Sequence, residues 1–565
     1  MAKRQANRAG GRAARGGLPA GVLDVWGGGQ LLAFSGLDGP TPYRHSLVAR
    51  TAFRDVGLLV KIPDEAELHF APGRPRKVFL TGDVFDIVHA AGRTRGAFLD
   101  AAHLLIEGPC RVRAAGAGLT CVTRDGRTLI AAAALCDPAL IAADLDEAVE
   151  RRMHWIKSVP KPRLPAGLPR KTLWKCLSVI KTNTYAPDGA IRHRYTTPDR
   201  WPHRGVWLWD SAFNAIGIRH LDAALARDAV EAVLDNQWPD GLVQISVFQD
   251  GRRSEMTQPP TLAMAAGLIH DSDPAGGGPW LRRIYPKLAA YLEWDMAHRD
   301  IDGGGLLEWA IEPNRRCRCG ESGWDNSPRF DCALPLDAVD FNSLLAVECE
   351  QMARLADLLD RRAERRTWAA RHRRLCRLIN RRLWNEDLGI YVDCEANTGR
   401  QRPMLSAAGL LPLACGAPTA RQARRLARHL RDPASLGTPL PVPTVSPSHA
   451  DMYSKDMWRG PVWVNVNWLI ARGLDRYRLR DEAVLIRRKT LAAVEKYYGR
   501  HGAIFEFFDD EDRIAPPDLL RKTLNDPSQW IHQVIHDYMW TATLYVDMRA
   551  AAAKTGRGSE PTGDR

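Results

Sequence analysis

Long hydrophobic runs are missing from this chain of 565 residues. Its longest apolar stretches, such as residues 128–140, are rich in alanine and shorter than the roughly 20 residues that a transmembrane helix needs. The basic N-terminal segment 1–17 also lacks the apolar core of a secretory signal. We therefore expect a cytoplasmic protein that does not associate with membranes.

A usable disulfide framework is missing as well. The eleven cysteines are odd in number and scattered from Cys110 to Cys415, which indicates a reducing compartment. Cys317, Cys319 and Cys332 lie close together in the sequence, but no fourth ligand follows at a zinc-type spacing. We therefore predict idle or buried thiols, no metal and no cofactor.

Acidic residues are outnumbered: the chain has 79 lysines and arginines against 66 acids, a net charge of +13. Part of the excess lies in segment 1–17, which has no acid, and part lies in segment 361–382. In the second segment four apolar residues recur at helical spacing, so its arginines should cover the solvated face of a helix. These residues are Trp368, Leu375, Ile379 and Leu383. Because no nucleic-acid recognition motif accompanies the charge, we predict no nucleic-acid partner.

The character of the sequence changes near residue 171. Before it, short β-branched runs alternate with Gly, Pro and Asp, which predicts a β-rich domain of sandwich type. After it, helix-period patterns follow one another without alternating strands, which argues against a doubly wound α/β fold and favours a toroid of helices. The predicted divisions are a disordered basic tail (1–20), an N-terminal β-rich domain (21–138), a helical and proline-rich linker (139–170), a helical domain (171–553) and a flexible tail (554–565). The predicted helices of the helical domain are 222–237, 280–299, 342–360, 367–384, 419–430, 464–477, 481–498 and 529–553.

Tryptophan is unusually frequent in the helical domain: 15 of the 18 tryptophans of the chain lie between residues 201 and 540, many of them in polar loops. An aromatic plane beside hydrogen-bonding groups suits a sugar, which has alternating C–H and O–H faces. Four dense segments stand out: WLWDS (207–211), QPP (258–260), GWDNSPR (323–329) and WRGPVW (458–463). Each alone has an ordinary explanation, such as a helix cap at Asp210 or a turn at Asp325. Four on one helical scaffold favour a binding or catalytic site.

Together with FEFFD at 505–509, these segments resemble the ordered motif set of glycoside hydrolase family 63. The resemblance covers about residues 182–542 and leaves out the β-rich domain. It is strongest to the bacterial branch with mannosylglycerate and glucosylglycerate hydrolases, and weaker to trehalases. It implies a mainly α protein whose catalytic domain is an (α/α)6 barrel, and hydrolysis of an α-glycosidic bond with inversion.

The resemblance also implies roles for particular residues. Inversion needs one carboxylic acid on the leaving oxygen and one carboxylate that activates water, roughly 6.5–9.5 Å apart. Asp325 matches the family's general acid, and burial beside Trp324 would help it stay protonated. Glu506 matches the general base. The residues that match the substrate-binding positions are Trp209, Asp210, Gln258, Trp324, Trp458, Arg459 and Trp463, and we add Arg204 beside them.

The base motif departs from the family pattern, because FEFFD is followed by the acids Asp510 and Glu511 rather than by the usual Pro-X-Thr-Gly. Asp509, Asp510 and Glu511 therefore compete with Glu506 for the role. Three other functions stay open: a neutral α-glucosidase or trehalase-like hydrolase, a transglycosylase, and a non-catalytic sugar-binding protein. The glycone, glucose or mannose, stays open too.

The segment before Asp210 is rich in cations. A small acidic leaving group such as glycerate would be held by arginine through charge-assisted hydrogen bonds. We therefore expect Arg192, Arg194 and Arg204 to favour an acidic glycoside over a neutral one, with a small carbohydrate as the only expected partner.

Overall fold

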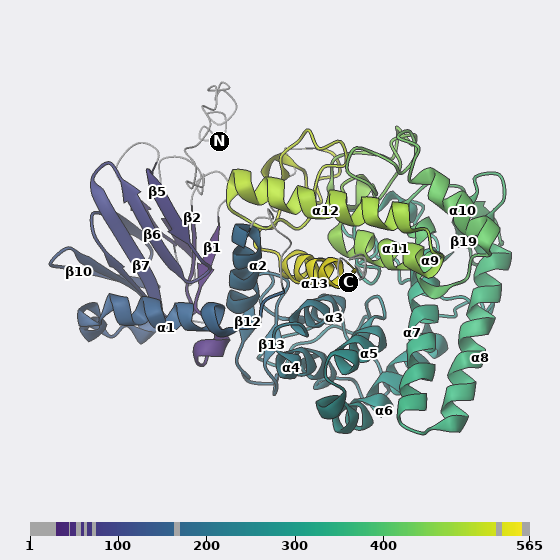
Figure 1. The fold of residues 1–565 in the computed structure, drawn as a ribbon, viewed down its shortest axis with the longest axis horizontal. Helices are drawn as coiled ribbons and strands as arrows, with labels where there is room; N and C mark the ends of the chain where they lie inside the picture. The colour runs from purple at the N-terminus through teal and green to yellow at the C-terminus, as the bar shows by residue number, and fades with distance from the viewer. Residues whose placement is uncertain are drawn as a thin grey trace, which may run out of the picture.

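The computed structural model describes residues 30–43, 46–51, 58–61, 65–69, 75–162, 170–526 and 534–555. The basic tail predicted at 1–20 lies outside these residues, as does all but the first part of the tail predicted at 554–565. The described residues are mostly helical, and the longer strands lie in a separate N-terminal region (Figure 1).

The N-terminal region contains two antiparallel sheets. The five-stranded sheet has the order β1 (Leu31–Ala33), β2 (Val48–Thr51), β3 (Leu58–Lys61), β4 (Glu65–His69) and β9 (Arg111–Ala115). The six-stranded sheet has the order β10 (Leu119–Arg124), β11 (Arg127–Ala132), β8 (His103–Glu107), β7 (Gly92–Asp100), β6 (Val84–His89) and β5 (Lys77–Leu80).

Alternating side chains fix how these sheets pack. Along β6, Phe85 and Ile87 point to one face and form an apolar cluster with Val60 and Leu68 of the five-stranded sheet. Val84 points to the opposite face of its sheet, where α1 (Leu145–Ser158) covers it. The two sheets thus pack face to face, and one helix closes the outer face of the larger sheet.

Helices are the main regular structure from residue 170 onward. They are α2 (Arg170–Thr182), α3 (Leu208–Ile218), α4 (Ala223–Leu234), α5 (Leu262–Ser272), α6 (Pro274–His298), α7 (Val339–Leu358), α8 (Arg362–Leu378), α9 (Pro412–Cys415), α10 (Ala420–His429), α11 (Val464–Arg476), α12 (Arg480–His501) and α13 (Met539–Thr555). Short strands and 3₁₀ turns connect them. Within the described residues, no helix is both long and apolar enough to cross a membrane.

Alternate helices contact each other in sequence order. α3 contacts α5, α5 contacts α7, α7 contacts α9, α9 contacts α11 and α11 contacts α13, which in turn contacts α3. Of the helices between them, α4 lies against α3, α6 against α5, α8 against α7 and α12 against α11 (Figure 1). The contact of α13 with α3 is close: a Cβ at Gly217 would lie 2.1 Å from the Thr543 carbonyl oxygen.

Amphipathic helices were easier to predict than fully buried ones. The predicted apolar stripe of the arginine-rich segment is confirmed, because Trp368, Leu375, Ile379 and Leu383 are all buried. The helix predicted at 529–553 begins only at Met539, and residues 527–533 lie outside the described part. Besides the eight predicted helices, the structure has α2, α3, α5 and α9 in this part of the chain; of these, the sequence indicated α3 through a possible cap at Asp210.

Candidate active site

Asp210 lies in the first turn of α3, and its side chain is buried rather than capping the helix. Its Oδ1 accepts a hydrogen bond of 3.1 Å from the Tyr538 hydroxyl. Burial raises the pKa of Asp210 well above its usual range, and the charges of Asp199 and Glu506 act in the same direction. Burial also raises the pKa of Tyr538, so its hydroxyl stays a donor.

Gln258 joins the loop before α5 to the start of α3. Its Oε1 accepts from the Trp209 backbone N–H at 3.3 Å, and its own carbonyl accepts from the Tyr291 hydroxyl at 2.8 Å. The QPP segment therefore lies directly beside the WLWDS segment, as the predicted site requires.

Asp325 lies on the loop between α6 and α7. Its carboxylate is half-buried, with 18% of the side chain exposed, and forms an ion pair with Lys522. The preceding Gly323 has a φ of +68°, and a Cβ there would lie 2.3 Å from the Trp209 ring. Only glycine fits this position, and its close approach places the GWDNSPR loop against α3.

Two polar side chains hold the GWDNSPR loop to the WRGPVW segment. Asn326 donates to Asp456 Oδ1 at 2.9 Å and accepts from the Trp458 backbone N–H at 3.0 Å. Arg459 pairs with Asp331 at 2.8 Å and donates to the Asn326 carbonyl oxygen at 3.1 Å. The two segments are thus one connected unit.

Five tryptophans form a continuous buried cluster below these loops. The Trp458 ring stacks on Trp463 at 3.7 Å and on Trp324 at 4.8 Å, measured between ring centroids. Trp209 and Trp540 complete the cluster, with a centroid distance of 5.1 Å and an edge-to-face geometry. All five are less than 5% exposed, so the structure uses these rings to hold the motif loops together.

The side chain of Glu506 is buried. Arg521 donates to both of its carboxylate oxygens, from Nε at 2.9 Å and from Nη2 at 3.2 Å. The competing acids are engaged elsewhere. Asp509 accepts from the backbone N–H groups of Arg513 and Ile514 at 2.8 Å each, and Asp510 accepts from the Tyr453 hydroxyl at 2.9 Å.

Arg521 and Lys522 were missed by the sequence analysis. They are adjacent in one loop, yet Arg521 pairs with Glu506 and Lys522 pairs with Asp325. Asp456 fixes this loop by accepting from the Lys522 N–H at 2.7 Å and the Thr523 N–H at 2.9 Å. No motif marks these residues, because the loop follows the point where the chain departs from the family pattern.

The cations expected to bind an acidic leaving group contact other parts of the protein. The Arg204 guanidinium is buried, donates to the Ser46 hydroxyl and lies 4.7 Å from the centroid of the Tyr43 ring. Arg194 pairs with Asp228, and Arg192 donates to the Asp235 carbonyl oxygen at 3.5 Å. These contacts hold the segment before α3 to its neighbours.

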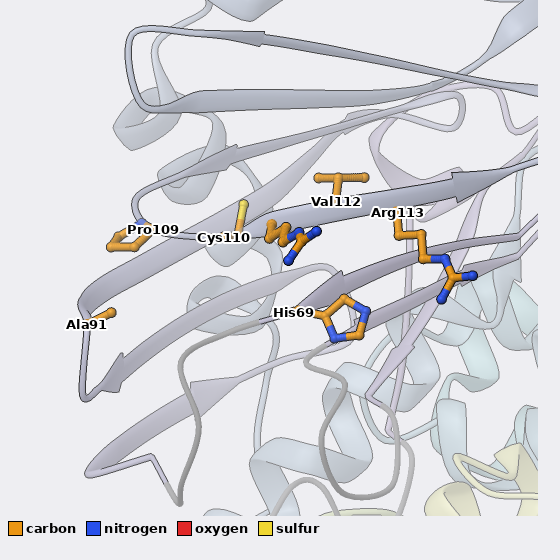
Figure 2. A pocket seen from close by; sticks show the side chains of 7 residues that line it. His69, Ala91, Pro109, Cys110, Val112 and Arg113 are labelled. Atoms are coloured by element: carbon orange, nitrogen blue, oxygen red, sulfur yellow. The ribbon is translucent and has the colours of Figure 1, made fainter.

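A pocket of about 860 Å³ lies in the N-terminal region. Figure 2 shows His69 and Arg113 on neighbouring strands at its rim, with Cys110 further along. Its lining residues are His69, Ala91, Pro109, Cys110, Arg111, Val112 and Arg113, and none of them belongs to the motif segments.

One group of carboxylates has the composition of a cation site. Single oxygens of Asp302, Glu308 and Asp337 lie within 4.8 Å of one another. Arg382 pairs with Asp337 at 2.6 Å and lies 3.5 Å from Asp302. Burial raises the pKa of Glu308 to about 8, so a shared proton and the arginine already offset most of the negative charge.

All eleven cysteines are free.

Residues 203–514 match a protein family described as the mannosylglycerate hydrolase MGH1-like glycoside hydrolase domain. The chain belongs to this family. It is therefore an O-glycosyl hydrolase, and the predicted relationship to glycoside hydrolase family 63 is confirmed.

The relatives agree with this assignment. Mannosylglycerate hydrolase MGH1 of Selaginella moellendorffii is 26% identical over an alignment of 396 residues, and the match covers 56% of this chain and 77% of that protein. The mannosylglycerate hydrolase of Thermus thermophilus is 26% identical over an alignment of 401 residues, and the match covers 57% of this chain and 92% of that protein. A solved structure of a family 63 mannosylglycerate hydrolase from Thermus thermophilus, with glucose bound, has a TM-score of 0.55 at 25% identity. The match covers 67% of this chain and 99% of that one.

Proposed function

We propose that the protein hydrolyses the α-glycosidic bond of a small glycoside with inversion, with Asp325 as the general acid and Glu506 as the general base. One observation carries the proposal: these two carboxylates lie far apart in the sequence, yet they pair with adjacent residues of one loop, Lys522 and Arg521. An inverting glycosidase requires two carboxyl groups about 6.5–9.5 Å apart, and pairing with adjacent residues brings Asp325 and Glu506 into one region of the fold.

The contacts of each carboxylate fit its role. The bidentate contact with Arg521 fixes the orientation of the Glu506 carboxylate, which a base needs in order to hold and activate a water molecule. Asp325 is the more exposed of the two, and its proton would pass to the leaving oxygen. Asp210 would then hold hydroxyl groups of the sugar, with Trp209 and Gln258 beside it.

We further propose an acidic leaving group such as glycerate. The Lys522 ammonium lies beside Asp325, the proposed general acid, and is partly exposed. A carboxylate on the leaving group could therefore pair with Lys522 while Asp325 contacts the glycosidic oxygen. The names of the relatives, which are mannosylglycerate hydrolases, point to the same class of substrate. Lys522 thus takes the role that the sequence suggested for Arg192, Arg194 and Arg204.

The architecture supports the proposal. We propose that α3, α5, α7, α9, α11 and α13, which contact one another in order and close on α3, form the inner wall of an (α/α)6 barrel. In this view residues 171–553 form the catalytic domain, 139–170 the linker, and 21–138 a separate β-rich domain of sandwich type.

The test combines a substrate panel with two nearly isosteric variants. Mannosylglycerate, glucosylglycerate, trehalose and a neutral aryl α-glucoside are incubated with the enzyme, and NMR follows the anomer that is released. We expect the glycosylglycerates to be preferred and the product to have the inverted configuration. Asp325→Asn and Glu506→Gln should each lower kcat by about 10²–10⁴-fold.

Three results would contradict the proposal. A retained anomer would exclude inversion, and preference for trehalose would favour the neutral hydrolase. Near-normal turnover of Glu506→Gln, together with loss of activity in Asp509→Asn, would assign the base to Asp509. The Asp509→Asn variant is the matched control, because Asp509 lies in the same segment but accepts hydrogen bonds from its own loop.

A further inference from the structure

Asp537 joins three parts of the chain that are distant in sequence. It lies in the turn before α13 with a φ of +54°, and its side chain is buried. Its Oδ2 accepts from the Leu31 N–H of β1 at 2.9 Å and pairs with Lys175 of α2 at 2.9 Å. Its Oδ1 accepts from the Ile504 N–H at 3.2 Å. The N-terminal region, α2 and the segment that carries Glu506 thus meet on one carboxylate.

The turn that carries Asp537 also builds the candidate site. The next residue is Tyr538, whose hydroxyl donates to Asp210 and whose N–H donates to the Ile504 carbonyl oxygen at 3.0 Å. The carbonyl oxygen of Ile535, two residues before Asp537, accepts from the Glu506 N–H at 2.9 Å. The turn at 534–538 is therefore joined by backbone hydrogen bonds to the segment that carries Glu506, and Asp537 links both to α2.

The side chain of Lys175 is buried, so its ammonium cannot turn outward into solvent. Its ammonium also donates to Gln30 Oε1 at 3.1 Å, just before β1. Figure 1 shows α2 between the N-terminal strands and the helices α12 and α13. A buried ion pair resists displacement, because separating its partners leaves a charge without compensation.

We propose that Asp537 is a positioning residue, through which Lys175 and the N-terminal β1 hold Tyr538 against Asp210. This inference rests on the proposed function, because it assumes that Asp210 binds the substrate. It gives the N-terminal region an indirect part in catalysis, because β1 helps to hold the turn that carries Tyr538.

A second lysine of α2 provides a matched control. Lys181 is also buried and pairs with Asp38 at 2.7 Å and with Asp83, both in the N-terminal region. Its ion-pair partners lie outside the turn at 534–538. Lys175→Met and Lys181→Met therefore remove the same kind of buried ion pair at the same interface, and only the first touches the proposed positioning contact.

We expect Lys175→Met to lower kcat by about 10- to 100-fold, the cost of a small misplacement in a catalytic site, while KM changes by less than about threefold. Lys181→Met should keep kcat within about threefold of the wild type. The decisive measurement is a double-mutant cycle with Tyr538→Phe. Lys175→Met and Tyr538→Phe should be strongly non-additive in kcat, because the first acts through the second, whereas Lys181→Met and Tyr538→Phe should be additive.

Hydrogen exchange supplies a measurement that does not need turnover. In Lys175→Met, peptides from 503–508 and 534–540 should lose protection at least tenfold relative to Lys181→Met. If Lys175→Met does not fold, Asp537→Asn, which keeps the side-chain shape, replaces it in both experiments. Equal effects of the two lysine variants on kcat and on exchange, or additivity with Tyr538→Phe, would overturn the inference. A wild-type protein that hydrolyses none of the panel, combined with the expected exchange difference, would reject the proposed function and retain the anchoring role of Asp537.

Discussion

At the scale of single residues, the proposed role of Lys522 predicts a difference between acidic and neutral substrates. Lys522→Met removes the ammonium that a substrate carboxylate would bind. The fall in kcat/KM for a glycosylglycerate should correspond to a loss of about 1.5–3 kcal/mol in transition-state binding. The value for a neutral aryl α-glycoside should change much less. Steady-state kinetics on both substrates measures the difference.

Arg192→Ala is the control for Lys522→Met. Arg192 is an exposed cation in the segment before α3, and the sequence alone suggested it for the same role. Its removal should affect both substrates equally. A larger selective loss in Arg192→Ala than in Lys522→Met would return the recognition of the leaving group to the segment before α3.

The buried carboxyl of Asp210 should lower the stability of the folded protein at neutral pH, and its proposed role in substrate binding gives a reason for keeping it. Its raised pKa means that the folded protein binds a proton more tightly than the unfolded chain, so stability falls as the pH rises above about 4. Asp210→Asn replaces the carboxyl by a neutral group of the same shape. The variant should gain on the order of 1–3 kcal/mol at pH 8, less at pH 5, and lose most of its turnover.

Thermal unfolding of Asp210→Asn and the wild type at both pH values tests this prediction. Asn214→Asp on the same helix is a useful opposite case, because Asn214 is also buried and the change adds a charge. It should destabilise the protein more at pH 8 than at pH 5. An Asp210→Asn variant that is less stable than the wild type at pH 8 would contradict the prediction.

At the scale of elements, sequence periodicity is clearest in helices that have a solvent-exposed side. The arginine-rich α8 was predicted because its apolar residues recur at helical spacing beside charged ones. All residues of α3 are buried, so it has no polar face, and the sequence indicated this helix only through Asp210 as a possible cap at its start. The QPP segment likewise precedes α5, whose first turns are buried.

The contact between two motif segments depends on one glycine. Gly323→Ala would need a positive φ and would press a methyl group into the Trp209 ring. We expect a loss of stability of about 1–3 kcal/mol and a clear fall in kcat, because the loop that carries Asp325 must move. Chemical denaturation and steady-state kinetics measure the two effects.

Gly303→Ala is the matched control for Gly323→Ala. Gly303 has a similar φ of +70°, but no atom lies within 4 Å of a Cβ at that position. Gly303→Ala therefore carries the backbone strain without the clash, and its kcat should stay near that of the wild type. Equal losses of kcat in both variants would remove the contact with Trp209 from the explanation.

At the scale of the whole molecule, the motifs named the candidate residues but not the side chains that contact them. Asp325, Glu506 and Asp210 could be named because each lies in a recognisable segment. Asp456, Arg521, Lys522 and Tyr538 could not, since their role depends on which distant segments the fold brings together. Arg204 shows the reverse: it stands beside a motif, yet its guanidinium contacts the N-terminal region.

The helices α3, α5, α7, α9, α11 and α13 form a ring that closes where α13 contacts α3. Asp547 of α13 is a buried acid at this contact. It pairs with Arg219 after α3 at 2.7 Å and accepts from Trp468 Nε1 of α11 at 2.7 Å. Burial alone would raise the pKa of Asp547, but the hydrogen bond from His220 and the charge of Arg219 outweigh it and hold the pKa below its usual range. Its contribution to stability is therefore complete above about pH 4 and is lost as the pH falls further.

Asp547→Asn should lower the free energy of unfolding by about 3–5 kcal/mol at pH 7, because Arg219 is left as a buried charge without its partner. The difference from the wild type should shrink steadily below pH 4, where the native carboxyl also takes up a proton. Glu350→Gln is the control: Glu350 joins α7 to Arg476 of α11 through an exposed ion pair, whose loss should cost less than about 1 kcal/mol. Urea unfolding of the three proteins between pH 3 and pH 7 measures these differences. A pH-independent loss in Asp547→Asn would show that packing of the side chain, and not its charge, closes the ring.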